Sequence, residues 1–164
     1  MNLNLILALI ILFLGISIPY IIQFIDKKKR EKTKNYFGDT LKRTGHPLIR
    51  LYHNKKPYLL LLDTGATHNV IDKNIIKELD KKFVRKDSIA LQGINSNDTE
   101  MMETYRIRFD DKNNSFTDDF IAMDLCDVFS DTENEIGEPV IGILGVGFLS
   151  KYALTLDFKQ NTVK

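Results

Sequence analysis

YLLLLDTGA, residues 58–66, is the stretch of sequence that decides the fold we expect for this chain. Its apolar run is typical of a strand buried on both faces, and residues 48–53 and the turn at 54–57 before it complete a hairpin. A carboxylate at the end of a buried strand is unfavourable without partners, so the position of Asp63 requires an explanation.

Two interpretations explain a carboxylate at this position. In the first, Gly65 lets the chain turn tightly, the Thr64 hydroxyl ties the loop down, and Asp63 points into a cleft. In the second, Asp63 accepts a hydrogen bond from its own backbone in a β-turn, as Asp-x-Gly segments often do. These three residues alone do not distinguish a reactive carboxylate from a structural one.

A second apolar stretch lies near the end of the chain, where residues 140–145 read VIGILG. Two apolar residues followed by glycine recur where a strand passes close beneath an active-site loop, because glycine has no side chain to block the approach. We therefore expect Ile143, Leu144 and Gly145 to lie under the loop that carries Asp63.

The rest of the soluble part reads mainly as short strands. Alternating apolar and polar residues at 101–109 are typical of a sheet with one solvent-facing side. A short helix is expected at 73–79 with Asp72 as its cap, and one or two helical turns at 147–152. The remaining expectations are strands at 88–92, 116–125, 139–144 and 153–158 and an acidic loop at 127–138. These elements predict an all-β domain, a small closed barrel with one or two short helices.

Composition limits the possible functions. The chain has 164 residues, of which 43% are hydrophobic and 27% charged, as in an ordinary globular domain. Between Asp98 and Glu135 there are twelve acidic side chains and three basic ones, so this part of the chain repels phosphates. The sequence therefore predicts no nucleic-acid partner.

Cysteine and histidine give no sign of redox or metal chemistry. The single cysteine, Cys126, excludes an internal disulfide and is expected to be a small apolar core residue in a reducing compartment. His46, His53 and His68 match no common metal-ligand spacing, even with Cys126, so we expect surface or hydrogen-bonded histidines. We therefore predict no metal and no cofactor.

Residues 1–25 carry no charged side chain and are long enough, as a helix, to cross a bilayer. A cleaved signal peptide or a buried core helix is the alternative, but residues 1–4 lack basic side chains and the run ends in bulky ones. Six basic residues between 27 and 34 predict the N-terminus outside and the domain in the cytoplasm. We therefore expect a single-pass membrane protein with a transmembrane anchor at 1–25, a basic juxtamembrane linker at 26–45 and a folded domain at 46–164.

These motifs together resemble the retropepsin-like aspartic proteases over about residues 46–160. The shared features, in the same order, are the hairpin, the loop after it, a short helix, a glycine-containing hairpin, the apolar-apolar-Gly motif and a closing segment. The resemblance implies a closed barrel of the acid protease type that needs no cofactor. The implied site residues are Asp63 for catalysis, Thr64, Gly65 and Ala66 in the supporting loop, Gly93, Ile94 and Asn95 in a flap over the substrate, and Ile143, Leu144 and Gly145 in the apolar motif.

Two positions depart from the pattern of the family. The expected flap holds a single glycine, Gly93, where many relatives have several, and this bears on the mobility of the flap. Val146 and Gly147 stand where relatives often have a polar residue after the apolar motif, and this bears on substrate details.

The number of Asp-Thr-Gly motifs predicts the assembly. Peptide hydrolysis by aspartates requires two carboxyls, one ionised to accept a proton from water and one protonated to polarise the scissile carbonyl. This chain has one such motif, since residues 98–100 and 131–133 begin with Asp-Thr but end in glutamate. We therefore expect a homodimer with Asp63 of each chain at the two-fold axis, acting on a peptide or protein substrate. The alternative is an inactive membrane-tethered β-domain used for dimerisation or peptide binding.

Overall fold

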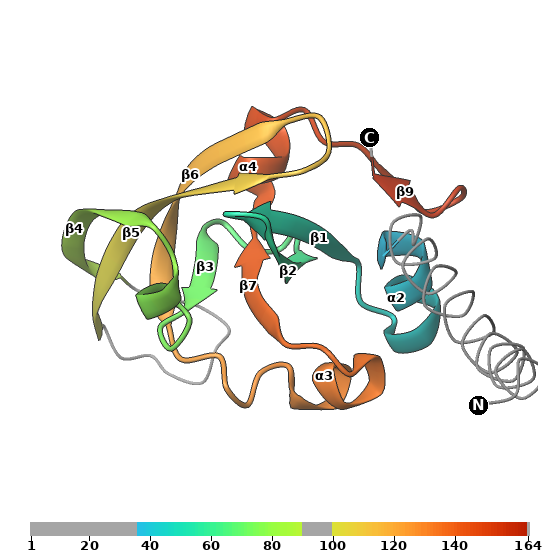
Figure 1. Ribbon diagram of the computed structural model, residues 1–164, viewed down its shortest axis with the longest axis horizontal. Helices are drawn as coiled ribbons and strands as arrows, with labels where there is room; N and C mark the ends of the chain where they lie inside the picture. Colours follow the sequence, from blue (N-terminus) through green and yellow to red (C-terminus); the bar gives the residue numbers. More distant parts are fainter. Residues whose placement is uncertain (1–35, 90–99, 164) are drawn as a thin grey trace, which may run out of the picture. The chain divides into compact units, whose positions relative to one another are not determined.

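The computed structural model describes residues 36–89 and 100–163 and joins most of their strands in one hydrogen-bonded sheet (Figure 1). The strands are β1 Leu48–His53, β2 Lys56–Leu62, β3 Asn69–Asp72, β4 Lys81–Ile89, β5 Glu100–Asp110, β6 Ser115–Met123 and β7 Val140–Leu144. The expected membrane anchor at 1–25 and the expected flap at 93–95 lie outside the described residues. Within the part that is described, no helix combines the length and the apolar character that a membrane crossing needs.

The sheet of the described residues closes on itself. Its strand order is β1-β2-β7-β3-β6-β5-β4, and β1 also meets β5 through Tyr52 and Asp110. All of these strands except β4 therefore form a closed circuit, and β4 extends the sheet outward from β5. The prediction of a small closed all-β barrel is confirmed.

Strand β2 is a buried strand of the barrel wall. Leu59, Leu60 and Leu62 are buried, with β1 antiparallel on one edge of β2 and β7 parallel on the other. The register pairs Leu62 with Leu144, so the two parallel strands end at the same level. The residues that follow β2 are thereby placed beside those that follow β7.

Strand β3, which the sequence analysis did not predict, completes this part of the barrel. It runs antiparallel to β7 and parallel to β6. Val70 and Ile71 belong to two different apolar clusters, because successive residues of a strand face opposite sides. Gly142 of β7 lies opposite, and a side chain there would collide with the carbonyl oxygen of Val70.

The folded unit begins earlier than the sequence predicted. Residues Tyr36–Thr44 form helix α2, inside the expected linker 26–45. Phe37 and Thr40 are buried, and the Thr40 hydroxyl accepts a hydrogen bond from the backbone N–H of Leu48 at 3.3 Å. The linker prediction is therefore wrong for residues 36–44, which form a helix with one buried face. The basic side chains of the segment gave no indication of that face.

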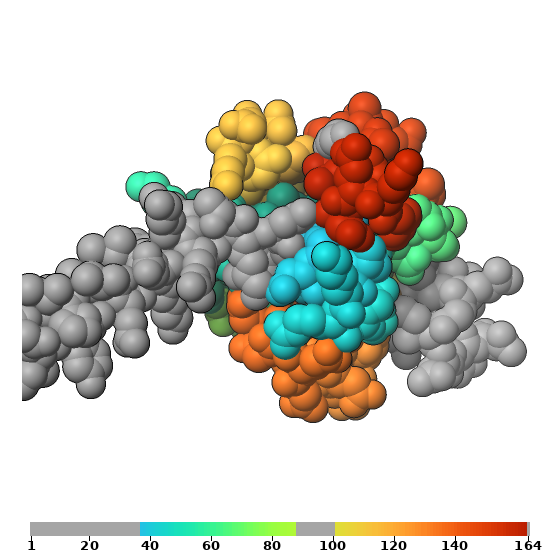
Figure 2. Space-filling model, turned by 90° about the vertical axis from the view of Figure 1, so that its right-hand side faces the viewer, coloured from blue at the N-terminus to red at the C-terminus, as the bar shows by residue number. Residues whose placement is uncertain are grey.

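Helix α2 also packs against the C-terminal residues, which lie beside it in Figure 2. The rings of Phe37 and Phe158 are 5.8 Å apart. The expected strand at 153–158 is wrong for most of its length, because Ala153 and Asn161 adopt positive φ angles of 52° and 53° and turn the chain. What remains is a two-stranded sheet, β8 Leu156–Asp157 and β9 Thr162–Val163.

The other helices of the described residues are short: η1 Ile76–Glu78, α3 Ser130–Ile136 and α4 Val146–Lys151. The helix expected at 73–79 is reduced to the 3-10 turn η1, and the Asp72 carboxylate accepts a hydrogen bond from the N–H of Asn74 at 2.9 Å in a turn before it. The segment 127–138, expected to be an acidic loop, contains helix α3, which its acidic composition did not indicate. The helix is capped by Gly137, whose φ of 78° is left-handed.

Candidate active site

Asp63 follows β2 directly, at the edge of the barrel where β2 and β7 end together. Its backbone N–H donates to the carbonyl oxygen of Leu144 at 3.0 Å and so continues the pairing of the two strands. Oδ1 of its carboxylate accepts a hydrogen bond from the N–H of Gly65 at 2.8 Å. Oδ2 has no hydrogen-bond partner among the described residues, which leaves one carboxylate oxygen for chemistry.

The structure shows the local turn that the second interpretation of the Asp-Thr-Gly segment predicts, and the cleft of the first stays a prediction. The bond from Gly65 to the carboxylate is the expected local turn, and the N–H of Ala66 closes it on the Asp63 carbonyl oxygen at 3.2 Å. A Cβ atom at Gly65 would lie 3.2 Å from Oδ1 of Asp63, so a side chain there would crowd the carboxylate. Thr64 is exposed and its hydroxyl binds none of the described residues, so its supporting role stays a prediction.

Gly145 brings the second motif directly against this loop. A Cβ atom on Gly145 would lie 2.7 Å from the carbonyl oxygen of Ala66 and 2.8 Å from that of His68, closer than real Cβ atoms approach backbone oxygens. The next N–H, that of Val146, donates to the Ala66 carbonyl oxygen at 2.8 Å. The end of β7 therefore passes under the Asp63 loop at a distance that only glycine allows.

Asn69 is a site residue that the sequence analysis missed. Its side chain is 8% exposed at the start of β3, and its Oδ1 accepts a hydrogen bond from the N–H of Gly145 at 3.0 Å. Its Nδ2 donates to the carbonyl oxygen of Asp119 in β6 at 3.1 Å. The signal that could have found it is a single amide side chain immediately before the apolar residues of a buried strand.

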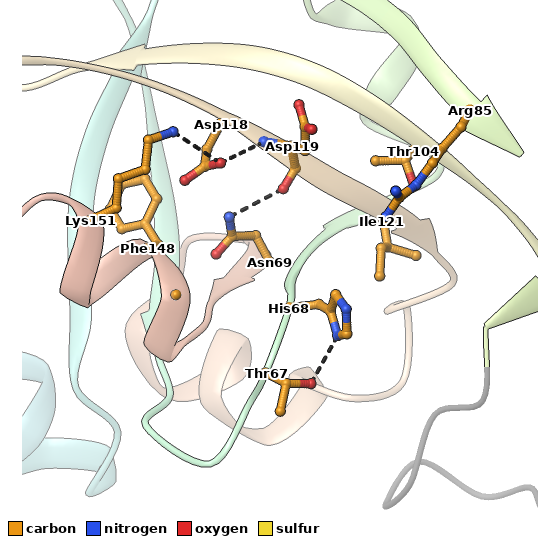
Figure 3. Close-up of a pocket in the computed structure, with 11 residues that line it drawn as sticks. Thr67, His68, Asn69, Arg85, Thr104, Asp118, Asp119, Ile121, Phe148 and Lys151 are labelled. Atoms are coloured by element: carbon orange, nitrogen blue, oxygen red, sulfur yellow. Dashed lines mark hydrogen bonds and ion pairs between the residues drawn. The ribbon is translucent and has the colours of Figure 1, made fainter. Parts of the chain in front are cut away.

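A pocket opens beside the loop (Figure 3). Its volume is about 270 Å³, and it begins at Thr67 and His68, which directly follow the loop. Strands β4, β5 and β6 and helix α4 provide its other walls, so it is built from segments far apart in the sequence. Most of its lining side chains are polar, and Ile121 and Phe148 are its large apolar ones.

The acidic groups around this pocket are engaged with basic ones. Lys151 Nζ lies 3.3 Å from Asp118 Oδ1, and hydrogen bonds from the Arg106 guanidinium lower the pKa of the Asp119 carboxyl. Thr104 differs, because it is 2% exposed and its hydroxyl has no hydrogen-bond partner in the described part of the chain. A buried hydroxyl without a partner is unfavourable, and this one lies in the pocket wall.

Cys126 is exposed, which corrects the prediction that it is a core residue. Strand β6 ends at Met123, so Cys126 lies in the connection that follows and not within the sheet. A hydrogen bond with the neighbouring Asp124 raises the pKa of the thiol. The thiol is therefore a poor nucleophile, and we assign it no role in the site.

The three histidines are hydrogen-bonded, as predicted. His53 is 5% exposed, its Nδ1 lies 2.7 Å from the carbonyl oxygen of Arg108, and its Nε2 accepts from the N–H of Asp80 at 2.8 Å. His46 and His68 each contact a threonine hydroxyl, at 2.6 and 2.8 Å. Within the described ranges, no group of three His, Cys, Asp or Glu side chains is placed to hold a metal ion.

The comparisons with known proteins agree with this geometry. The family model described as aspartyl protease matches residues 49–148, a range that contains Asp63 and Gly145. Among solved structures, the EIAV protease complexed with the inhibitor HBY-793 is similar at 18% identity, over 69% of this chain and 93% of that chain, with a TM-score of 0.48. No protein of the curated set matches. Since the family model spans more than half of the chain, this protein belongs to the aspartyl protease family.

Proposed function

We propose that the protein is a membrane-anchored aspartic endopeptidase that hydrolyses peptide bonds with a water molecule activated by two Asp63 carboxyls of a homodimer. The observation that carries this proposal is the placement of Asp63, held by the Leu144 carbonyl oxygen at its backbone and by Gly65 at Oδ1. Its second carboxylate oxygen is not used by the fold of the described residues. A carboxylate that is held in place through one oxygen, with the other oxygen unpaired, is suited to proton transfer.

The reaction needs a second carboxyl, and a second copy of the chain supplies it. Two Asp63 side chains brought together at a two-fold axis share one proton, because adjacent like charges are unfavourable. The ionised carboxylate takes a proton from water, the oxygen of that water attacks the scissile carbonyl carbon, and the protonated carboxyl donates its hydrogen bond to the carbonyl oxygen. Transfer of a proton to the departing nitrogen then breaks the carbon–nitrogen bond and restores the pair.

The pocket beside the loop supports peptide binding. Its volume of about 270 Å³ suits one amino-acid side chain, and its first wall is the segment that directly follows the Asp63 loop. Ile121 and Phe148 give it apolar surface, and Thr67, Arg85 and Lys151 are among its polar lining residues. An extended peptide over Asp63 would place a side chain there and gain its binding energy close to the scissile bond.

Membrane attachment belongs to the same proposal and rests on the sequence. The uncharged run at 1–25 followed by basic residues supports a single span with the enzyme domain in the cytoplasm. Confinement of two chains to one membrane would raise their effective concentration and favour the dimer. A reporter fused after Lys164 should be protected in intact spheroplasts, and digestion of that reporter by added protease would contradict the orientation.

The test of activity is cleavage of a mixed peptide library by the purified full-length chain in detergent. Wild-type protein should cut a defined subset of peptides, and Asp63→Asn should cut none while keeping the same melting temperature and dimer content. Cleavage by Asp63→Asn at the wild-type rate would overturn the assignment of the catalytic residue. A folded wild-type dimer that cleaves nothing would favour the alternative, an inactive β-domain used for dimerisation or peptide binding.

A further inference from the structure

Asn69, whose side chain is buried, makes one hydrogen bond to Gly145 beneath the Asp63 loop and one to Asp119 of β6. We propose that Asn69 is a positioning residue, one that fixes the Asp63 carboxylate through Gly145 without touching the substrate. The inference rests on the proposed protease function, because it assigns a role in that reaction. Its starting point is a buried amide between two segments of the site, labelled near the centre of Figure 3.

The first contact links Asn69 to Asp63 through the end of β7. Oδ1 of Asn69 accepts the N–H of Gly145 at 3.0 Å, in a buried position. The preceding residue, Leu144, offers its carbonyl oxygen to the N–H of Asp63 at 3.0 Å. The N–H and the C=O concerned belong to the same peptide unit, which is planar, so a rotation of that unit would disturb both bonds together. Asn69 therefore controls the orientation of the group that holds Asp63.

The second contact fixes the amide itself. Nδ2 of Asn69 donates to the carbonyl oxygen of Asp119 in β6 at 3.1 Å, marked by a dashed line in Figure 3. An amide has one accepting and one donating end, and its partners here are the N–H of Gly145 and a carbonyl oxygen. A flipped amide would face donor to donor and acceptor to acceptor, so one orientation alone satisfies both neighbours.

Close packing makes this contact hard to replace. The carbonyl oxygens of Ala66 and His68 already lie against Gly145, which leaves no room for another side chain over that residue. Removal of the amide would leave the Gly145 N–H buried without an acceptor, which is unfavourable. The end of β7 would then shift to find one, and Asp63 would move with it.

A role in stability alone predicts a different result, so the test needs a matched control. His53 is also a buried polar side chain with two backbone partners, Arg108 and Asp80, and neither belongs to the Asp63 loop. Asn69→Ala and His53→Ala should both lower the melting temperature. We expect kcat per folded molecule to fall on the order of tenfold or more in Asn69→Ala, with KM nearly unchanged, and to stay within about twofold of wild type in His53→Ala.

A second variant gives a readout that lost stability would not move. In Asn69→Asp the side chain is nearly isosteric, but it can donate to the Asp119 carbonyl only when protonated. Its activity relative to wild type at the same pH should therefore rise as the pH falls, whereas the ratio for Asn69→Ala should stay flat. The titratable neighbours in the pocket are Asp118 and Asp119 of β6, His68 after the loop, Arg85 of β4 and Lys151 of α4, and they are common to both variants.

The outcomes separate this inference from the proposed function. If wild type cleaves, Asp63→Asn does not, and Asn69→Ala loses no more activity than His53→Ala, the protease assignment stands and the role of Asn69 is refuted. If wild type cleaves nothing, amide NMR decides: Asn69→Ala should expose the Gly145 amide to faster exchange and shift the Asp63 amide resonance. Unchanged resonances of both residues would overturn the positioning role.

Discussion

A buried polar side chain that bridges neighbouring elements lies near each end of β2. The two ends differ in the residues that surround this side chain. Strand β2 runs from Lys56 to Leu62, so its ends are separated by roughly 20 Å. At the first end, the buried His53 joins β1 to β5 and to the residue before β4. At the second end, the buried Asn69 joins β3 to β6 and to the end of β7.

The difference lies in what each buried polar residue holds. Around His53 the neighbouring turn of Asn54 and Lys55 is exposed and carries positive φ angles of 50° and 68°, which gives a tight hairpin. Around Asn69 a carboxylate and a glycine, Asp63 and Gly145, lie where the backbones approach closely. A buried polar bridge therefore joins strands at both ends, and the close backbone approach distinguishes the end that carries Asp63.

The largest effect is expected at Gly145. It tests whether the end of β7 passes closely beneath the Asp63 loop. Gly145→Ala would place a Cβ atom 2.7 Å from the Ala66 carbonyl oxygen, and such overpacking should lower the free energy of unfolding by on the order of 3 kcal/mol. The matched control is Gly147→Ala in helix α4, whose Cβ would lie 3.8 Å from the Thr67 carbonyl oxygen. That control should be neutral or stabilised by about 0.5 to 1 kcal/mol. Equal denaturant midpoints for the two variants would refute the close approach.

His53 tests the other end of the comparison. His53→Ala removes the acceptor of the Asp80 N–H and the donor to the Arg108 carbonyl oxygen, and both partners are left without their hydrogen bond. We expect the free energy of unfolding in urea to fall by about 2 to 3 kcal/mol. The control, His46→Ala, loses one contact to the Thr132 hydroxyl and should be affected less. A larger loss in His46→Ala would show that the buried bridge at His53 does not hold this end.

Thr104 tests the pocket beside the Asp63 loop, because its buried hydroxyl lies in the pocket wall. Its hydroxyl is buried without a partner in the described residues, so the nearly isosteric Thr104→Val should raise the free energy of unfolding by about 1 kcal/mol. The exposed Thr117→Val, on the neighbouring strand β6, is the control and should change little. If the pocket holds a substrate side chain, Thr104→Val should also shift cleavage in a peptide library towards apolar residues at one position. A destabilised Thr104→Val would show that the hydroxyl has a partner.

The smallest effect is expected at Asp124, to which we assign no role in the reaction. A hydrogen bond from Lys73, followed by one from Cys126, lowers the pKa of Asp124 to about 2. Because the folded-state value lies below the ordinary value of about 3.9, the stabilising effect is complete above that value and is lost as the pH falls towards 2. Asp124→Asn should therefore lower the melting temperature slightly at pH 6 and not at pH 2. A difference that persists unchanged at pH 2 would contradict this origin.

The Asp63 end of β2 could be predicted from the sequence because its signals are local. The apolar run before Asp63 and the apolar pair before Gly145 each indicate a buried strand that stops at a special residue. Their meeting follows from the parallel register of β2 with β7. The closed barrel followed in the same way from alternating residues, since alternation fixes which face of a strand is buried.

The features that were missed depend on contacts between distant segments. The sequence marks Asn69 only as an amide before apolar residues, and its two partners, Gly145 and Asp119, come from distant segments. Helix α2 was missed because its basic residues suggest a solvated linker, whereas Phe37 packs into the core cluster with residues from distant strands and lies 5.8 Å from the ring of Phe158. Composition describes the exposed face of such segments and carries no information on the partner that covers the other face.

The measurement that tests the account most directly is the activity of mixtures of wild-type and Asp63→Asn chains at constant total concentration, with exchange of subunits complete. If each active centre needs Asp63 from two chains, an equal mixture should retain about one quarter of the wild-type activity, since that fraction of randomly formed dimers is wild type on both sides. Retention of about one half would mean that each chain acts alone, and the paired-carboxyl account would be contradicted.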